Sequence, residues 1–184
     1  MQYSVLSYPI ISIILLLVLS LGDLVLGYFA KKSYERYTSN FIVYEAAPSG
    51  SPGAKENELT RIGLKLLPVL VVFLIWLIAA SSGIVASMRL YHAILGFALT
   101  IYLIIDLRYL ETILIGDLVK NRKELLSGRL LIGHGFSLGQ SAIQLFTLTV
   151  ILFTVFLFAW EPFSLGAALA PLSLLIRNLV LLKS

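Results

Sequence analysis

Long apolar runs with almost no charge constrain this chain more than any other feature. The first extends from Pro9 to Ala30 and contains Asp23 as its single charged residue. A helix of that length is about 33 Å long, which matches the hydrocarbon core of a bilayer. Only 13% of all residues are charged, against about a quarter in soluble domains. A water-soluble globule is therefore excluded, and we expect a multi-pass integral membrane protein.

Five such runs predict a polytopic, all-α membrane helix bundle with five transmembrane helices, forming one domain over residues 1–184. Arg89 separates the second run from the third with almost no linker, so these antiparallel spans should meet in a tight turn near residues 81–87. Pro162 ends the fourth run, because proline cannot continue a helix normally. The predicted spans are 9–30, 66–88, 90–118, 131–160 and 163–182, with cytoplasmic loops at 31–62 and 119–130.

The distribution of Lys and Arg predicts the orientation. Basic residues flank the loops 31–62 and 119–130, which lie on the same side of a five-span bundle, and Arg89 alone falls on the other side. Cytoplasmic loops are enriched in Lys and Arg, so we expect the N-terminus outside and the C-terminus inside the cell membrane. The third helix should project into the cytoplasm, because the charged positions from Asp106 to Asp117 continue it without a Gly-Pro break.

The first loop has features of a membrane surface. Its aromatic residues Tyr34, Tyr37, Phe41 and Tyr44 repeat at helical spacing, which predicts that the first helix continues as an amphipathic segment among the headgroups. Basic side chains beside the spans are expected to contact anionic headgroups, namely Lys31, Lys32, Arg36, Lys120, Arg122 and Lys123. The net charge of +4 therefore points to membrane lipids as partners and not to nucleic acid.

Asp23 is the residue that most needs an explanation. It lies about 12 Å along the helix from Lys31, inside the predicted span, and has to be protonated, paired or hydrated there. It is either a proton or cation site or a hydrogen-bonding group that orients the first helix. Gln140 lies at a similar depth in the fourth span, which predicts an Asp23–Gln140 contact. Gln144, Tyr102 and Asp106 complete the predicted intramembrane polar cluster.

The fourth run also predicts close packing between helices. Gly135 and Gly139 are four residues apart, a spacing that lets two membrane helices approach, and glutamine amides can then bond across the contact. The polar stripe on this helix fits helix packing or the lining of a transport pathway. We expect a homo-oligomer or a larger membrane complex.

Enzymatic chemistry has little support in the sequence. The chain contains no P-loop, Rossmann, zinc-protease or serine-hydrolase motif, and the lack of cysteine excludes thiolate sites. A metal site made by Asp106, Glu111 and His134 at the cytoplasmic boundary is an alternative. The spacing of Asp106 and Glu111, however, separates their side chains by about 140° around a helix. We predict no cofactor.

Three functions remain open from the sequence alone. The first is a non-enzymatic scaffold or subunit of a membrane assembly, which the packing face and the basic cytoplasmic surface favour. The second is a small transporter or channel that uses Asp23. The third is a metal-dependent enzyme that acts on lipids at the cytoplasmic boundary.

Overall fold

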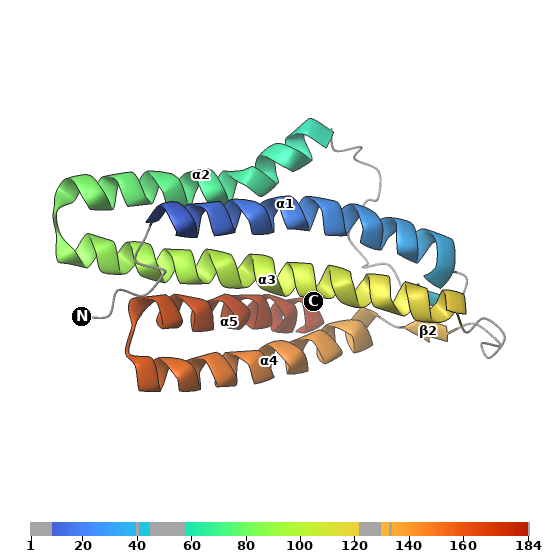
Figure 1. The fold of residues 1–184 in the computed structure, drawn as a ribbon. Helices are drawn as coiled ribbons and strands as arrows, with labels where there is room; N and C mark the ends of the chain where they lie inside the picture. Colours follow the sequence, from blue (N-terminus) through green and yellow to red (C-terminus); the bar gives the residue numbers. More distant parts are fainter. Residues whose placement is uncertain (1–8, 40, 45–57, 122–129, 133, 184) are drawn as a thin grey trace.

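The computed structural model describes residues 9–39, 41–44, 58–121, 130–132 and 134–183 (Figure 1). Five long helices make up most of this part of the chain. Their bounds are α1 Pro9–Ser33, α2 Glu58–Ser82, α3 Val85–Asn121, α4 His134–Ala159 and α5 Pro162–Lys183. Each contains a segment long and apolar enough to cross a membrane. The prediction of five helices that are long and apolar enough to cross a membrane is confirmed.

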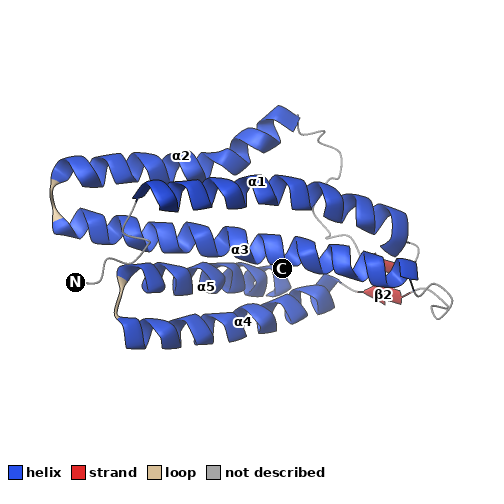
Figure 2. Cartoon of the chain, in the orientation of Figure 1, coloured by secondary structure: helices blue, strands red, loops and turns tan. Residues whose placement is uncertain are grey.

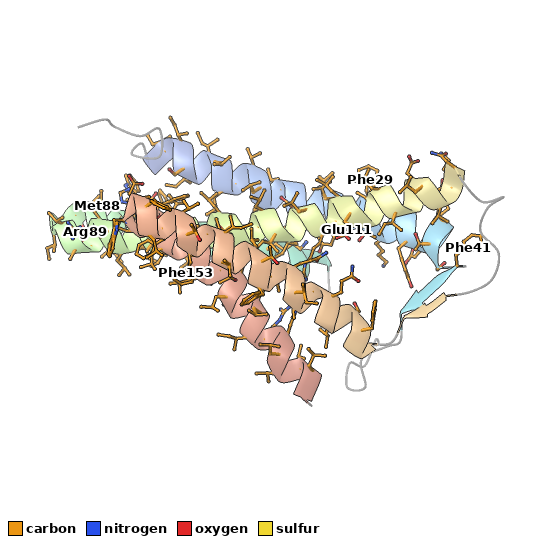
Figure 3. The ribbon with its side chains drawn as sticks, turned by 90° about the horizontal axis from the view of Figure 1, so that it is seen from below. Phe29, Phe41, Met88, Arg89, Glu111 and Phe153 are labelled. Carbon is orange, nitrogen blue, oxygen red and sulfur yellow. The ribbon has the colours of Figure 1, made fainter. Side chains whose placement is uncertain are left out.

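The longest helix, α3, lies in the middle of the bundle (Figure 1). It packs against α1 and α2 on one side and against α5 on the other, and α4 packs mainly against α5. The short turns that join α2 to α3 and α4 to α5 lie at the same end of the bundle (Figure 2). Met88 and Arg89 lie at this turn end, and Phe41 lies at the other end (Figure 3).

The predicted boundary at Arg89 between the second and third spans is wrong. Helix α2 ends at Ser82 and α3 begins at Val85, because the chain reverses at small residues before it reaches the charged one. Gly83 has a φ of 63°, a left-handed conformation that is easiest for glycine. The hydroxyls of Ser82 and Ser87 lie 2.7 Å apart across the turn. The turn itself lies where its small residues predicted it.

The end of α1 also differs from the prediction. A π-helical turn, η2 Tyr34–Thr38, continues α1, so the helical prediction is right as far as Thr38. It is wrong beyond that point, since Ile42–Tyr44 forms a short strand, β1, which pairs in parallel with β2, Leu130–Ile132. The β-branched residues Ile42 and Val43 and the aromatic residue Tyr44 are of types that favour strands. The strand after η2 and the strand before α4 therefore lie side by side at one end of the bundle. The predicted order of the spans likewise puts these two segments on the same side.

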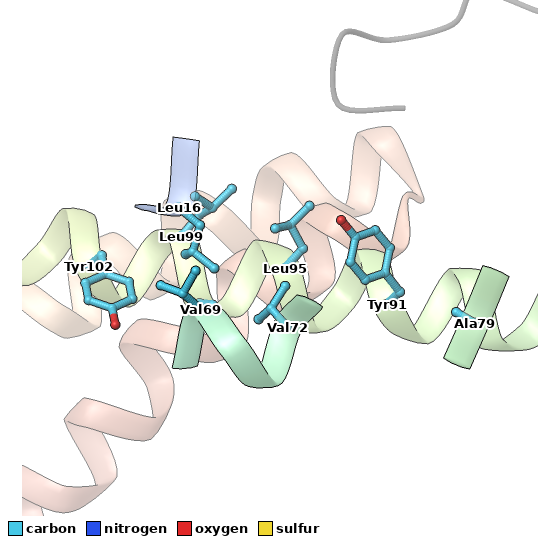
Figure 4. Packing of buried hydrophobic residues seen from close by; sticks show 9 residues of the cluster. Leu16, Val69, Val72, Ala79, Tyr91, Leu95, Leu99 and Tyr102 are labelled. Carbon is cyan, nitrogen blue, oxygen red and sulfur yellow. The ribbon is translucent and has the colours of Figure 1, made fainter. Parts of the chain in front are cut away.

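The main core lies between α1, α2 and α3. Leu16, Val69, Val72, Leu95 and Leu99 are buried there against one another (Figure 4). A smaller core between α3, α4 and α5 contains Ile104, Ala142, Leu145 and Leu175. Many other large apolar side chains are exposed, as expected for surfaces that face lipid.

Glycines bring α3 and α5 into close contact. A Cβ built on Gly166 of α5 would lie 2.6 Å from the carbonyl carbon of Ala93, and one on Gly96 of α3 would lie 3.0 Å from that of Phe163. The packing role predicted for Gly139 involves no neighbour within the described part of the chain, where a Cβ on Gly139 would have no atom within 4 Å. The surroundings of Gly135, its predicted partner, lie outside the described residues.

Candidate functional site

Asp23 on α1 forms an ion pair with Lys65 on α2. Asp23 Oδ2 lies 2.8 Å from Lys65 Nζ, and the two side chains are 4% and 21% exposed, respectively. Lys65 Nζ also donates a hydrogen bond of 3.4 Å to the backbone carbonyl of Asp23. Lys65 was not among the site residues predicted from the sequence. The signal that could have identified Lys65 is its position along the helix. Lys65 lies seven residues after the start of α2, and Asp23 lies a similar eight residues before Lys31, near the end of α1.

A bend in α2 brings the backbone of Lys65 into the same site. Pro68 lies inside α2 and lacks the N–H that would bond to the preceding turn, and α2 bends in its N-terminal part (Figure 1). The Lys65 carbonyl accepts a hydrogen bond of 3.2 Å from Ser20 Oγ and another from the Tyr102 hydroxyl. Hydroxyls from α1 and α3 thereby satisfy a backbone acceptor next to the bend, as membrane helices with internal prolines require.

Asp106 on α3 places a second carboxylate beside this ion pair. Asp106 is buried, and a Cβ built on Gly22 of α1 would lie 3.5 Å from its Oδ2 atom. It interacts electrostatically with both Asp23 and Lys65. The Oδ1 atoms of Asp23 and Asp106 have no hydrogen-bond partner within the described part of the chain. In this charge cluster of Asp23, Lys65 and Asp106, one ammonium group therefore serves two carboxylates.

A groove of about 430 Å³ between α2 and α3 opens beside the charge cluster. Asp23, Lys65 and Tyr109 line its polar end, where Lys65 Nζ lies 5.5 Å from the centroid of the Tyr109 ring. Most of the remaining wall is apolar and includes Val71 and Phe97. The groove can therefore accept an apolar group whose polar end reaches the charge cluster.

A second polar site, which we call the polar pocket, lies between α3 and α4. Its volume is about 190 Å³, and its lining consists of Arg108, Glu111, Thr112, Ile115, Ser137, Gln140, Ser141 and Gln144. The guanidinium of Arg108 donates a hydrogen bond to Ser141 Oγ. Asn178 of α5 donates a hydrogen bond of 2.8 Å to the same oxygen. One serine hydroxyl thus connects three helices.

The single polar cluster predicted from the sequence is two separate sites. Asp23, Tyr102 and Asp106 interact with one another, whereas Gln140 and Gln144 line the polar pocket. The predicted Asp23–Gln140 contact is wrong, because α3 lies between α1 and α4 (Figure 1). Equal depth in two spans is not enough for contact, since the order of the helices around the bundle decides which spans are neighbours.

Two of the three residues considered for a metal site point to different neighbours. Asp106 approaches Gly22 of α1, whereas Glu111 lines the polar pocket with α4, as expected from their angular separation. The side chain of His134 lies outside the described residues. Within the described ranges, no three His, Cys, Asp or Glu side chains are grouped closely enough to hold a metal ion.

Basic residues predicted to contact headgroups surround a third depression, which we call the basic groove. It has a volume of about 570 Å³ and lies between the end of α1 with η2 and the last turns of α3, with Lys32, Arg36 and Lys120 in its lining. Lys31 is exposed nearby, and its Nζ atom lies 3.9 Å from Glu35 Oε1. The other two residues of this prediction, Arg122 and Lys123, lie outside the described residues.

The two polar sites differ in the chemistry that they can perform. The charge cluster has unused hydrogen-bond acceptors, so it can take up a proton, a cation or another donor. The polar pocket has an arginine and several hydroxyl and amide groups, so it can take up an anion. Comparison with known protein families, curated proteins and solved structures finds no match to this chain.

Proposed function

We propose that the protein is a non-enzymatic subunit of an assembly in the cell membrane, with its N-terminus outside and its C-terminus inside. The ends of α1 and α3 project from the inner face of the bilayer and dock an amphipathic helix of another subunit. Three features support this proposal: the length of α3, the charge of the projecting end, and the apolar side chains exposed on it.

The length of α3 supports a projecting end. The turn at Gly83 marks one surface of the membrane, and about 20 residues of helix cross a hydrocarbon core of about 30 Å. Starting at Val85, α3 would therefore cross by about residue 105. The helix continues to Asn121, which leaves about 24 Å beyond the hydrocarbon core.

Helix α1 accompanies α3 along this projecting part. A Cβ on Gly27 would lie 3.3 Å from the ring of Tyr109, and one on Gly116 would lie 3.2 Å from the Cβ of Ser33. Lys120 Nζ lies 5.8 Å from the centroid of the Tyr37 ring. The two helices therefore remain packed together, and we call residues 27–38 and 106–121 the projecting pair.

The charge of the projecting pair supports its cytoplasmic location. Lys31, Lys32, Arg36 and Lys120 all belong to it, whereas Arg89 lies at the opposite, turn end of the bundle (Figure 3). Membrane proteins retain Lys and Arg preferentially on the cytoplasmic side.

The observation that carries the proposal is the apolar surface of the projecting pair. Leu114 and Leu118 are each 63% exposed, and Phe29 and Leu110 are also exposed. Such exposure is ordinary in lipid, but outside the hydrocarbon core a continuous apolar surface indicates a binding site for another protein. The lining of the basic groove combines this apolar surface with three cationic side chains and one carboxylate, Asp117. An amphipathic helix with acidic residues beside its apolar face would complement both.

Photocrosslinking in native membranes tests the proposal. The photoreactive residue p-benzoylphenylalanine is placed at Leu114 on the projecting pair, and at Leu103, an exposed position of α3 inside the predicted hydrocarbon core, as the matched control. We expect a discrete polypeptide adduct at Leu114 and lipid adducts at Leu103. Lipid adducts alone at both positions would show that this part of α3 neither projects nor docks a subunit.

The charge cluster favours a second candidate, a transporter coupled to a proton or cation. Its supporting observation is the pair of carboxylate oxygens, one on Asp23 and one on Asp106, that have no partner in the described part of the chain. Proton uptake by liposomes containing the purified protein tests this candidate. Flux that persists in the Asp106→Asn variant, or flux absent from the unmodified protein, would eliminate it.

A further inference from the structure

Arg108 is a half-buried cation whose hydrogen-bonding capacity is largely unused. A guanidinium has five N–H groups, and within the described residues the Arg108 guanidinium donates a hydrogen bond to Ser141 Oγ. The ion pairs of the described residues do not include Arg108. Placing an unneutralised charge in a low-dielectric site costs free energy, so an anionic partner would stabilise this arrangement.

Other side chains of the polar pocket add donors around Arg108. Ser141 Oγ accepts hydrogen bonds from both Arg108 and Asn178, which uses its two acceptor positions and leaves its own proton available. Gln140 and Gln144 also line the pocket, and each carries an amide with two N–H donors. The pocket therefore surrounds Arg108 with several further hydrogen-bond donors.

The surrounding charges leave the site positive. Arg177 of α5 is close enough to repel Arg108 electrostatically, and Glu111 attracts it, although the Glu111 carboxylate is not among the ion-paired groups of the described residues. Two guanidinium groups and one carboxylate give a formal charge of +1. A phosphodiester carries the single negative charge that would neutralise this site.

The depth of the polar pocket matches that of lipid phosphates. Arg108 lies 23 residues beyond the start of α3, or about 35 Å from the turn end. Gln140 lies 19 residues before the end of α4, or about 29 Å from that end. Both distances are close to the hydrocarbon thickness of about 30 Å, beyond which the headgroups begin. The apolar residue Ile143 is exposed on α4 nearby, on the hydrocarbon side of Gln140, and can contact acyl chains.

We propose that the polar pocket binds a phosphate group, with Arg108 as its principal cation and Ser141 and Gln144 as hydrogen-bond donors. The phosphate belongs to a phospholipid of the inner leaflet or to a soluble phosphate ester, and the chemistry recognised at Arg108 is the same in both. With a volume of about 190 Å³, the pocket is smaller than the clefts of about 300–1,000 Å³ that enclose whole drug-sized ligands. It suits a headgroup whose chains remain outside.

Equilibrium binding to the purified full chain in detergent tests this proposal with three probes: dioleoyl phosphatidylglycerol, dioleoylglycerol, which has the same chains without phosphate, and inorganic phosphate. We expect phosphatidylglycerol to bind, and Arg108→Gln to weaken its binding at least tenfold, because a charge-assisted hydrogen bond is lost. Arg89→Gln is the matched control, since it removes the same charge from the turn end of α3. The affinity of this variant for phosphatidylglycerol should equal that of the unmodified protein.

The remaining outcomes separate the sources of phosphate and can overturn the proposal. Arg108-dependent binding of inorganic phosphate without binding of phosphatidylglycerol assigns the pocket to a soluble ester. Equal binding of phosphatidylglycerol and dioleoylglycerol, or unchanged binding in Arg108→Gln, overturns phosphate recognition. Should Arg108→Gln fail to fold, Arg177→Gln replaces it, because this side chain is exposed. That variant should weaken phosphatidylglycerol binding severalfold, and unchanged binding would again overturn the proposal.

Discussion

Replacing Gly166 with alanine should separate α3 from α5. The added Cβ would lie 2.6 Å from the carbonyl carbon of Ala93 and 2.9 Å from its Cα, whereas carbon atoms in contact are about 3.5–4.0 Å apart. These two atoms and the carbonyl oxygen of Ala93, which is closer still, are all backbone, so no side chain can rotate away. The helices must therefore move apart by roughly 1 Å, a gap that removes between a quarter and a half of the dispersion energy of each contact across it.

The expected loss of stability can be estimated from opposing effects. Overpacking a tight contact costs about 1–3 kcal/mol, and the backbone clash at Gly166 on α5 puts this substitution at the upper end of that range. Alanine stabilises a helix by about 1 kcal/mol relative to glycine. The net decrease in the free energy of unfolding should be about 2 kcal/mol.

Unfolding by SDS in mixed micelles, followed by the fluorescence of Trp76 and Trp160, measures this change. Gly139→Ala on α4 is the matched control, because its Cβ would meet no atom of the described residues within 4 Å. This variant should be as stable as the unmodified chain or more stable by up to about 1 kcal/mol. A Gly166→Ala protein as stable as the unmodified chain, or a Gly139→Ala protein that loses as much stability as Gly166→Ala, would refute the close-packing argument.

Other contacts make equally specific predictions for the free energy of unfolding, measured in the same way. Asp23→Asn removes the carboxylate that pairs directly with Lys65 and should cost about 2–3 kcal/mol, and the added substitution Lys65→Met should recover most of this loss; no recovery would contradict the pairing. Gly83→Ala should cost about 1 kcal/mol, because alanine is strained at the φ of 63°. Gly63→Ala in the interior of α2 should instead stabilise the protein by about 0.5–1 kcal/mol. Effects of the same sign in the two variants would refute this distinction. Glu35→Gln breaks an exposed ion pair with Lys31 and should change stability by less than about 0.5 kcal/mol, so a larger loss would mean that this pair is not exposed in the membrane.

The spanning helices could be predicted because hydropathy over about 20 residues is a local property of the sequence. Their neighbours could not, since packing depends on the order of the helices around the bundle. The sequence shows that Asp23 is a charge inside a span and requires a partner, but equal depth points to Gln140. With the second span predicted to begin at residue 66, Lys65 falls just outside it, among the basic residues that flank the first loop.

The glycine contacts show a similar limit of sequence reasoning. Gly135 and Gly139 have the spacing expected for packing, but a Cβ on Gly139 would meet open space. Gly96 stands alone among larger residues, and its importance comes from the backbone of α5 opposite it. The pattern of Gly166 and Ala170, also four residues apart, could have indicated the α5 side of the contact. No pattern within α3 alone could identify its partner helix.

The parallel pairing of β1 with β2 has a consequence for the order in which the protein is made. Ile42 pairs with Leu130, so the second strand leaves the ribosome 88 residues after the first. At about 5–20 residues per second, this delay lasts about 4–18 s, during which α2 and α3 are synthesised. The pairing is thus a late step in biogenesis that cannot precede synthesis of the first three spans. A nascent chain arrested before Leu130 would contain these spans without the connection between their loops.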